Sequence, residues 1–251
     1  MCKYKKLYLS NNYFFVNMLD DANIMYIRPM MSGTEENYLK ALFHLSHSKG
    51  EVNISDLSKH LQVKLPTANS MMKRLSEKKL VIHENYKPIK LSEKGKIEAA
   101  LIIRKHRLTE MYLVEIMGLG WEEVHEIAEQ IEHIQSPAFF DKMDELLGYP
   151  NVDPHGSPIP DQQGHVTLAD YQKLSDHKAG DQVQFMAVGD SATDLLNYLN
   201  TKSLPLGTIL YIESVENFDG TMSVSYNDKK NELLSSKVCD KLLVQDKVVI
   251  S

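Results

Sequence analysis

The chain has little that could hold it together covalently or place it in a membrane. Only two residues are cysteine, Cys2 and Cys239, and their wide separation excludes a disulfide framework and a zinc ribbon. No apolar run reaches the ~18–20 residues that a membrane-spanning helix needs. Asn and Asp interrupt the stretch after the basic N-terminus, so the sequence does not indicate a signal peptide. We therefore expect a protein of the reducing cytoplasm, without a membrane partner.

Two motifs of common enzymes are also missing. The sequence contains no HExxH zinc motif and no glycine-rich phosphate loop. Without these motifs the sequence indicates no particular reaction, and we expect a protein that is not an enzyme. A metalloenzyme stays open as an alternative, because clustered carboxylates and imidazoles can hold a catalytic ion.

The charge of the chain is unevenly distributed. The net charge is −6, which argues against a protein that binds nucleic acid over its whole surface. Residues 31–95, however, contain 11 Lys and Arg against 7 Asp and Glu, so this segment carries about +4. A basic segment on an acidic protein is typical of a local DNA-binding surface.

The apolar pattern of this basic segment predicts a winged helix-turn-helix domain. The predicted elements, in order, are a helix from Thr34 to Gly50, a short helix over 56–61 capped by Ser55, a helix from Pro66 to about Lys79, and strands over 80–84 and 89–91. This order of helices and hairpin is that of the winged helix. Residues 1–30 show no clear period, and we interpret them as an extension without assigned function.

The rest of the chain divides into a helical part and a β part. Three helices are predicted over 96–150, the first running toward Met117, the second from Trp121 to about Gln135 and the third from Pro137 to Leu147. Their apolar faces exceed what one small domain could cover, so we expect a homodimer. A linker rich in Pro and Gly covers 151–165. Residues 166–251 predict a small β-barrel, with strands over 182–188, 208–216, 222–226 and 247–250 and one helix over 191–200.

Two clusters of acidic and imidazole side chains lie on the predicted helices of the middle part. His106 and Glu110 are four residues apart in the first helix, and His125 and Glu129 are four apart in the second. Glu132 and His133 follow one turn later. Residues three or four apart share a helical face, so two such faces turned together would offer several oxygens and nitrogens to one divalent ion.

Four segments together resemble the diphtheria toxin repressor and manganese transport regulator family of metal-dependent transcriptional regulators. They are Thr34–Lys40, Arg104–Leu108, Val124–His133, and Asp153–Gly156 followed by Ile159–Pro160. The resemblance covers about residues 32–250. It implies a mainly α fold with a small β part: an N-terminal winged helix-turn-helix, a helical dimerisation domain and a C-terminal SH3-like β-barrel.

The resemblance also implies two metal sites. The principal set would be Asn37, His106, Glu129, Glu132 and His133. Asn37 departs from the family pattern, in which the manganese branch usually has Asp and the toxin repressor has Met. The second set would be Glu110, Asp153, His155 and Asp190, with Asp153 in place of a Cys, or alternatively His106, Glu110 and His125. His106 and His125 are therefore contested between the two schemes.

The donor atoms of these residues indicate which metal they suit. Oxygen and nitrogen donors without thiolate or thioether favour Mn(II) or Fe(II) on grounds of hardness. Glu129 is the residue that most favours these metals, because a Cys thiolate at this position would favour softer metal ions. We expect Mn(II) ahead of Fe(II), with the metal in the cell left open.

The family pattern also predicts the residues that meet DNA. Those of the recognition helix and its flank are Lys64, Pro66, Thr67, Asn69, Ser70, Lys73 and Arg74, and those of the wing are Tyr86 and Lys87. The predicted partner is a palindromic operator in double-stranded DNA, and the predicted role is repression of metal-uptake genes. A module that binds another protein, with a structural metal, is the second alternative.

Overall fold

The computed structural model describes residues 4–9, 12–17, 26–27, 31–84, 87–167 and 169–247. The chain forms two compact units, residues 1–102 and 103–251. None of the helices in the described ranges combines the length and the apolar character needed to cross a bilayer.

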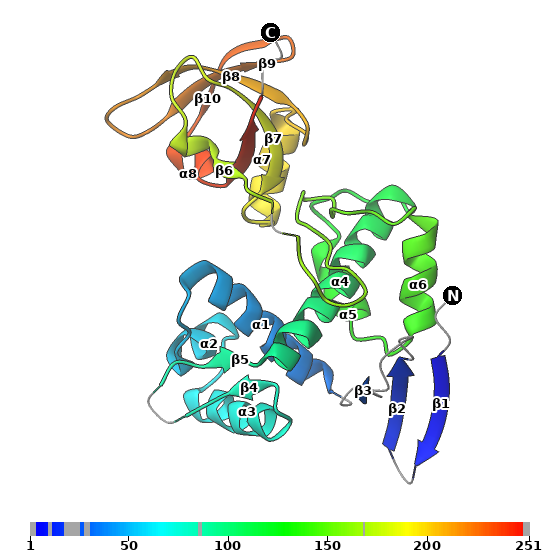
Figure 1. The fold of residues 1–251 in the computed structure, drawn as a ribbon. Helices are drawn as coiled ribbons and strands as arrows, with labels where there is room; N and C mark the ends of the chain where they lie inside the picture. The colour runs from blue at the N-terminus through cyan, green and yellow to red at the C-terminus, as the bar shows by residue number, and fades with distance from the viewer. Residues whose placement is uncertain are drawn as a thin grey trace. The chain divides into compact units, whose positions relative to one another are not determined.

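The first unit contains the predicted winged helix-turn-helix (Figure 1). Its elements are α1 (Gly33–Lys49), α2 (Ile54–His60), α3 (Leu65–Glu77), β4 (Val81–Ile82), β5 (Lys90–Leu91) and the start of α4 (Glu93–Glu115). The strands β4 and β5 pair antiparallel as the wing hairpin. One apolar core joins these elements, and Leu39, Met72 and Leu80 in it are fully buried.

Local chemistry explains where these helices begin and end. Ser32 and Glu35 form a reciprocal capping box at the start of α1, one of the strongest N-terminal signals. Gly50 ends α1 at a φ of 79°, a conformation that glycine adopts without strain. Asn53, and not the predicted Ser55, precedes α2, while Pro66 lies in the first turn of α3 as predicted.

The N-terminal extension contains secondary structure that the sequence did not predict. Three short strands, β1 (Tyr4–Leu9), β2 (Asn12–Asn17) and β3 (Tyr26–Ile27), form an antiparallel sheet. No alternation of apolar and polar residues marks them, which is why they were missed.

The helical part of the second unit consists of the rest of α4, α5 (His125–Ile131) and α6 (Pro137–Leu146). The predicted second helix was too long at both ends. At its start, the Gly120 amide donates to the Glu123 side chain and the chain turns before the helix begins. At its other end, Glu132 is the C-cap, so Glu132 and His133 lie just beyond α5.

The β part of the second unit is a six-stranded antiparallel sheet in the order β10-β9-β8-β7-β11-β6. Its elements are β6 (Gln172–Lys173), β7 (Gln182–Val188), α7 (Thr193–Thr201), β8 (Ile209–Val215), β9 (Met222–Tyr226), β10 (Lys229–Leu234), α8 (Ser236–Cys239) and β11 (Leu242–Asp246), with a 3₁₀ turn over Leu174–Asp176. The predicted fold class is confirmed, but between 169 and 247 no ladder joins the edge strands β10 and β6 into a closed barrel. The last strand in the described ranges is Leu242–Asp246, so Lys247 of the strand predicted over 247–250 is not in a strand, and residues 248–250 lie outside those ranges.

Gly95 lies where α4 passes closest to the turn before the wing. A Cβ atom at this position would stand 1.9 Å from the carbonyl oxygen of Leu80. Ser92 caps the start of α4, since its hydroxyl accepts the Gly95 amide and donates to the Lys79 carbonyl. The close approach therefore requires glycine, because a backbone atom cannot yield as a flexible side chain can.

We predict that Gly95→Ala destabilises the first unit by about 1–3 kcal/mol, the usual cost of forcing an extra methyl group into a packed site. Urea denaturation followed by circular dichroism measures the loss. Gly189→Ala is the matched control, because its added Cβ would lie 3.6 Å from its nearest neighbour, the Lys241 carbonyl oxygen. Equal stability of Gly95→Ala and the wild-type protein would contradict the proposed close packing.

Candidate metal centre

His106 lies at the centre of a buried polar cluster on α4. Only 7% of its surface is exposed, and both of its ring nitrogens face carboxylates. Nε2 lies 2.9 Å from Oε1 of Glu110, one turn further along α4. Nδ1 lies 2.6 Å from Oε2 of Glu132, just past the end of α5. One imidazole therefore links two carboxylates from different elements.

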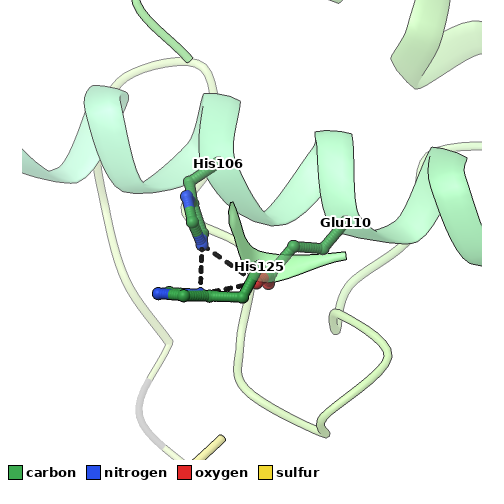
Figure 2. A group of neighbouring side chains, drawn as sticks. All are labelled: His106, Glu110 and His125. Atoms are coloured by element: carbon green, nitrogen blue, oxygen red, sulfur yellow. Dashed lines mark hydrogen bonds and ion pairs between the residues drawn. The ribbon is translucent and has the colours of Figure 1, made fainter. Parts of the chain in front are cut away.

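His125, the first residue of α5, completes a group of three donor atoms around Glu110. Its Nδ1 lies 3.2 Å from Nε2 of His106 and 3.2 Å from Oε1 of Glu110 (Figure 2). Ligand atoms that share one ion at ~2.1 Å stand roughly 3–3.5 Å from one another. The spacing of these three atoms therefore fits a common ion with little movement.

A second group of possible metal ligands lies near Nδ1 of His106. Oε1 of Glu129 lies 3.9 Å from Nδ1 of His106 and 3.8 Å from Nε2 of His125. Nε2 of His133 lies 3.8 Å from Oε1 of Glu132, which is fully buried. His106, Glu129 and Glu132 offer ligand atoms that all lie within 4.8 Å of one another.

A third group uses the loop after α6. Glu110, Asp153 and His155 also offer ligand atoms within 4.8 Å of one another, and all three are buried. Nδ1 of His155 lies 3.6 Å from Oε2 of Glu110, while its Nε2 donates to the Trp121 carbonyl at 2.9 Å. Because Nε2 donates to the carbonyl, Nδ1 is the ring nitrogen that faces Glu110, and in the neutral imidazole it is the atom that could bind a metal.

The loop that contains Asp153 and His155 is fixed by its own hydrogen bonds and by packing against β7. Oδ1 of Asp153 accepts the amides of His155 and Ser157 at 2.8 and 2.9 Å. Gly156 has a φ of 84°, and a Cβ there would stand 2.2 Å from the Met186 carbonyl oxygen of β7. The loop therefore packs directly against the first long strand of the sheet.

Burial and close partners shift the pKa values of this cluster. Burial alone would raise the pKa of Glu110, but hydrogen bonds from His106, His125 and His155 lower it far below its usual value. For His155 burial lowers the pKa, but the bond and charge of Glu110 outweigh it and raise the pKa overall. Burial raises the pKa of Asp153 even though Arg107, 3.4 Å away, opposes that shift. The cluster gathers negative charge that positive charge must balance, as a divalent cation would.

Three predicted ligands are not members of these groups: His133, Asp190 and Asn37. Asp190 pairs with Nζ of Lys241 at 3.2 Å and accepts the Ala192 amide. Asn37, on α1, has a buried side-chain oxygen with no hydrogen-bond partner among the described residues. An unpartnered buried carbonyl oxygen is a suitable metal ligand, so the Asn37 amide fits the hard donor set.

The predicted DNA-binding residues lie on the solvent side of the first unit. Lys64, Pro66, Thr67, Ser70 and Lys73 are exposed, and Asn69 is half-buried. Arg74 is exposed but has an ion-pair partner in Glu35. In the wing, Lys87 is exposed and pairs with Glu84, and Tyr86 lies outside the described residues.

Sequence reasoning missed two residues that support the cluster. Trp121 stacks on the His155 ring with centroids 5.9 Å apart, and its Nε1 donates to Asn200 of α7. Arg107 pairs with Asp153 and donates to the Pro158 carbonyl. Arg107 follows His106 directly, and a charged residue beside a ligand was a usable signal. Nothing local marks Trp121, because its partners are distant in sequence.

Family models match both units. The model described as the iron dependent repressor N-terminal DNA binding domain matches residues 30–89. The model described as the iron dependent repressor metal binding and dimerisation domain matches residues 92–161, which contain most of the cluster.

Individual proteins of this kind are also similar to the chain. The iron-dependent repressor IdeR of Mycobacterium tuberculosis is 32% identical over 127 residues, which are 51% of this chain and 55% of that protein. The chain therefore matches only about half the length of this relative. The regulator MntR of Bacillus subtilis is 28% identical over 48% of this chain and 84% of its own length. A solved manganese-dependent transcriptional repressor in complex with manganese is 29% identical, with a TM-score of 0.77 over 85% of this chain and 100% of that chain.

We predict that Mn(II) changes the emission of Trp121, the single tryptophan of the chain, because its ring stacks on His155 at the cluster. A fluorescence titration measures the change. Glu110→Gln should abolish it by removing the shared carboxylate, whereas Glu126→Gln, an exposed position on α5, should leave it intact. An unchanged response in Glu110→Gln would contradict the metal site.

We also predict a bell-shaped pH dependence for the stability of the metal-free protein. The lowered pKa of Glu110 contributes stability that is fully present above its usual value of 4.5 and is lost as the pH falls. The raised pKa of His155 contributes stability that is fully present below its usual value of 6.5 and is lost as the pH rises through the raised pKa.

The free energy of unfolding in chelator should therefore be highest between pH 4.5 and 6.5. Urea denaturation at a series of pH values measures it. Glu110→Gln should flatten the profile on both sides. A profile in this variant identical to that of the wild-type protein would show that the cluster does not cause the pH dependence.

Proposed function

Because the chain belongs to the iron-dependent repressor family of metal-dependent regulators, we propose that it is a metal-activated transcriptional repressor that binds DNA as a homodimer. The observation that carries the proposal is the convergence of ligand atoms from α4, α5 and the loop after α6 on Glu110 and His106. These segments are far apart in sequence, and a shared ion would hold them together.

Two overlapping ligand sets are proposed. Around Glu110 the ligands would be His106, His125 and, from the loop, His155 with Asp153. Around Glu132 they would be Glu129, His133 and His106, with Asn37 as the ligand from the first unit. Each ring nitrogen of His106 can bind one ion. His106 is therefore the residue that the two ligand sets share, with Nε2 in the first set and Nδ1 in the second. Asp190 stays a proposed ligand of the second set, and it would have to leave Lys241 to take part.

We propose Mn(II) as the activating ion, with Fe(II) as the alternative. The described donors are carboxylate, amide and imidazole groups, which suit hard and intermediate cations. Similarity to manganese-dependent and iron-dependent repressors supports both metals. The ion would supply the positive charge that these buried carboxylates require.

The exposed face of α3 would read the operator. Pro66 and Thr67 offer apolar contacts to thymine methyl groups, and Ser70 and Asn69 offer hydrogen bonds to base edges. Lys64, Lys73, Arg74, Lys87 and Tyr86 would contact phosphates and the sugar backbone. In a homodimer the two recognition helices would enter major grooves about one helical turn, ~34 Å, apart, which requires a palindromic operator.

Activation would work by a shift between conformations. Residues that bind the same ion cannot separate, so the protein can adopt fewer conformations when the metal is bound. If these conformations hold the two recognition helices at operator spacing, DNA binding becomes metal-dependent. Target genes for metal uptake would then be repressed when the metal is abundant.

The alternatives have less support. A metalloenzyme or a protein-binding module with a structural metal would also hold an ion here, but neither explains the basic first unit or the match to a DNA-binding family model. We propose that the protein is not an enzyme and acts in the cytoplasm, where its DNA would be. The proposed domain boundaries remain 31–95, 96–150 and 166–251, with an extension over 1–30 and a linker over 151–165.

We predict that Glu129→Ala and His133→Ala each abolish Mn(II)-dependent retardation of DNA, because each removes one ligand of the principal set. The probe is a duplex that the Mn(II)-loaded wild-type protein selects from a random-sequence pool, and size-exclusion chromatography checks the dimer. Glu126→Ala, which removes an exposed carboxylate from the same helix, should keep the metal dependence. Metal-independent DNA binding by the wild-type protein would refute the proposed activation.

A further inference from the structure

Glu35 is a buried charge in the first unit that the proposed function does not use. It lies in the first turn of α1 and has no exposed surface. Its Oε2 accepts the Ser32 amide at 2.8 Å, as part of the capping box. A capping glutamate needs only this bond, and it usually keeps its charge in water.

The carboxylate of Glu35 also forms ion pairs with Arg74 of α3 and with Lys78, the residue that caps the C-terminus of α3. Oε1 lies 2.9 Å from Nε of Arg74 and 2.8 Å from Nζ of Lys78. Arg74 and Lys78 are four residues apart at the C-terminal end of α3. One buried carboxylate therefore joins the start of α1 to the end of the proposed recognition helix.

This ion pair limits the directions that the Arg74 side chain can take. The side chain remains 57% exposed, although its Nε is paired with a buried carboxylate oxygen. A guanidinium group is planar and carries five N–H donors, so an ion pair on the Nε side leaves the donors of the two Nη atoms available on the opposite, exposed side. A long side chain that is already oriented loses less conformational entropy when it binds a partner.

We propose that Glu35 is a positioning residue for DNA binding: it holds Arg74 in the orientation in which its Nη groups meet a phosphate. The inference rests on the proposed function, because it assumes that α3 meets DNA. It adds an acidic residue, buried beneath the recognition helix, to the residues that determine affinity.

The direction in which removing the Glu35 charge changes DNA affinity distinguishes a positioning role from simple charge repulsion. A carboxylate near a DNA-binding surface repels phosphates, so removing its charge should strengthen binding if charge alone mattered. A positioning role predicts the opposite, since Arg74 would be released from its fixed orientation. Glu35→Gln keeps the shape of the side chain and removes the charge.

The experiment compares Glu35→Gln with Glu77→Gln, which makes the same charge change at an exposed position of α3. The probe is the duplex selected by the Mn(II)-loaded wild-type protein, and Kd is measured over a series of salt concentrations. Glu35→Gln should bind about tenfold more weakly, and the slope of log K against log salt should fall by about one, as for the loss of one phosphate contact. Glu77→Gln should not weaken binding and should keep the wild-type slope.

Arg74→Gln tests whether Glu35 acts through Arg74. It should reproduce the weaker binding and the smaller slope, and adding Glu35→Gln to it should change little further. The slope also separates positioning from damage to the fold, because partial misfolding lowers the active fraction without changing the number of phosphate contacts.

Three outcomes would overturn the inference. Glu35→Gln could bind as tightly as the wild-type protein or more tightly, which would show a purely repulsive role. It could bind more weakly with an unchanged salt slope, which would show a role in folding only. If the wild-type protein retards no duplex, the proposed function fails and this inference fails with it. In the first two cases the proposed repressor function stands.

Discussion

The buried carboxylate of Glu110 is the constraint on which the metal-binding part of this protein depends. A carboxylate with 3% of its surface exposed is costly unless positive partners surround it. Three imidazoles, from α4, α5 and the loop after α6, provide these partners. A proton on His155, whose pKa is raised by Glu110, or a divalent ion can supply positive charge. Since the fold cannot leave the carboxylate unbalanced, the protonation of this cluster and its occupancy by metal are linked.

The same physical arrangement occurs in both units. In the second unit, the cluster reaches the sheet through His155 and Gly156, which pack against Trp121 and β7. In the first unit, Glu35 is a buried carboxylate that receives two cations from another helix. Each carboxylate fixes the relative position of elements that are distant in sequence. Each carboxylate therefore contributes both to the fold and to a proposed function, which is metal binding for Glu110 and DNA binding for Glu35.

The sequence predicted contacts within one element better than contacts between elements. The pairs His106–Glu110 and His125–Glu129 follow from the helical period, and the bounds of β7 and β9 follow from alternation and turns. The edge strand β10 was missed because it is polar and has a bulge next to Asn231, where φ is 55°. The end of α5 depends on a turn at Glu132 whose side chain faces His106, and no local pattern encodes it. The ion pairs of Glu35 join residues about 40 positions apart, and therefore only the structure reveals them.

The most direct test of this account is to locate Mn(II) in crystals of the protein by anomalous scattering. The account predicts a peak among Nε2 of His106, Oε1 of Glu110 and Nδ1 of His125, or on the opposite face of His106 beside Glu129 and Glu132. Mn(II) bound only at surface carboxylates, with His106 and Glu110 still bonded to each other, would contradict it.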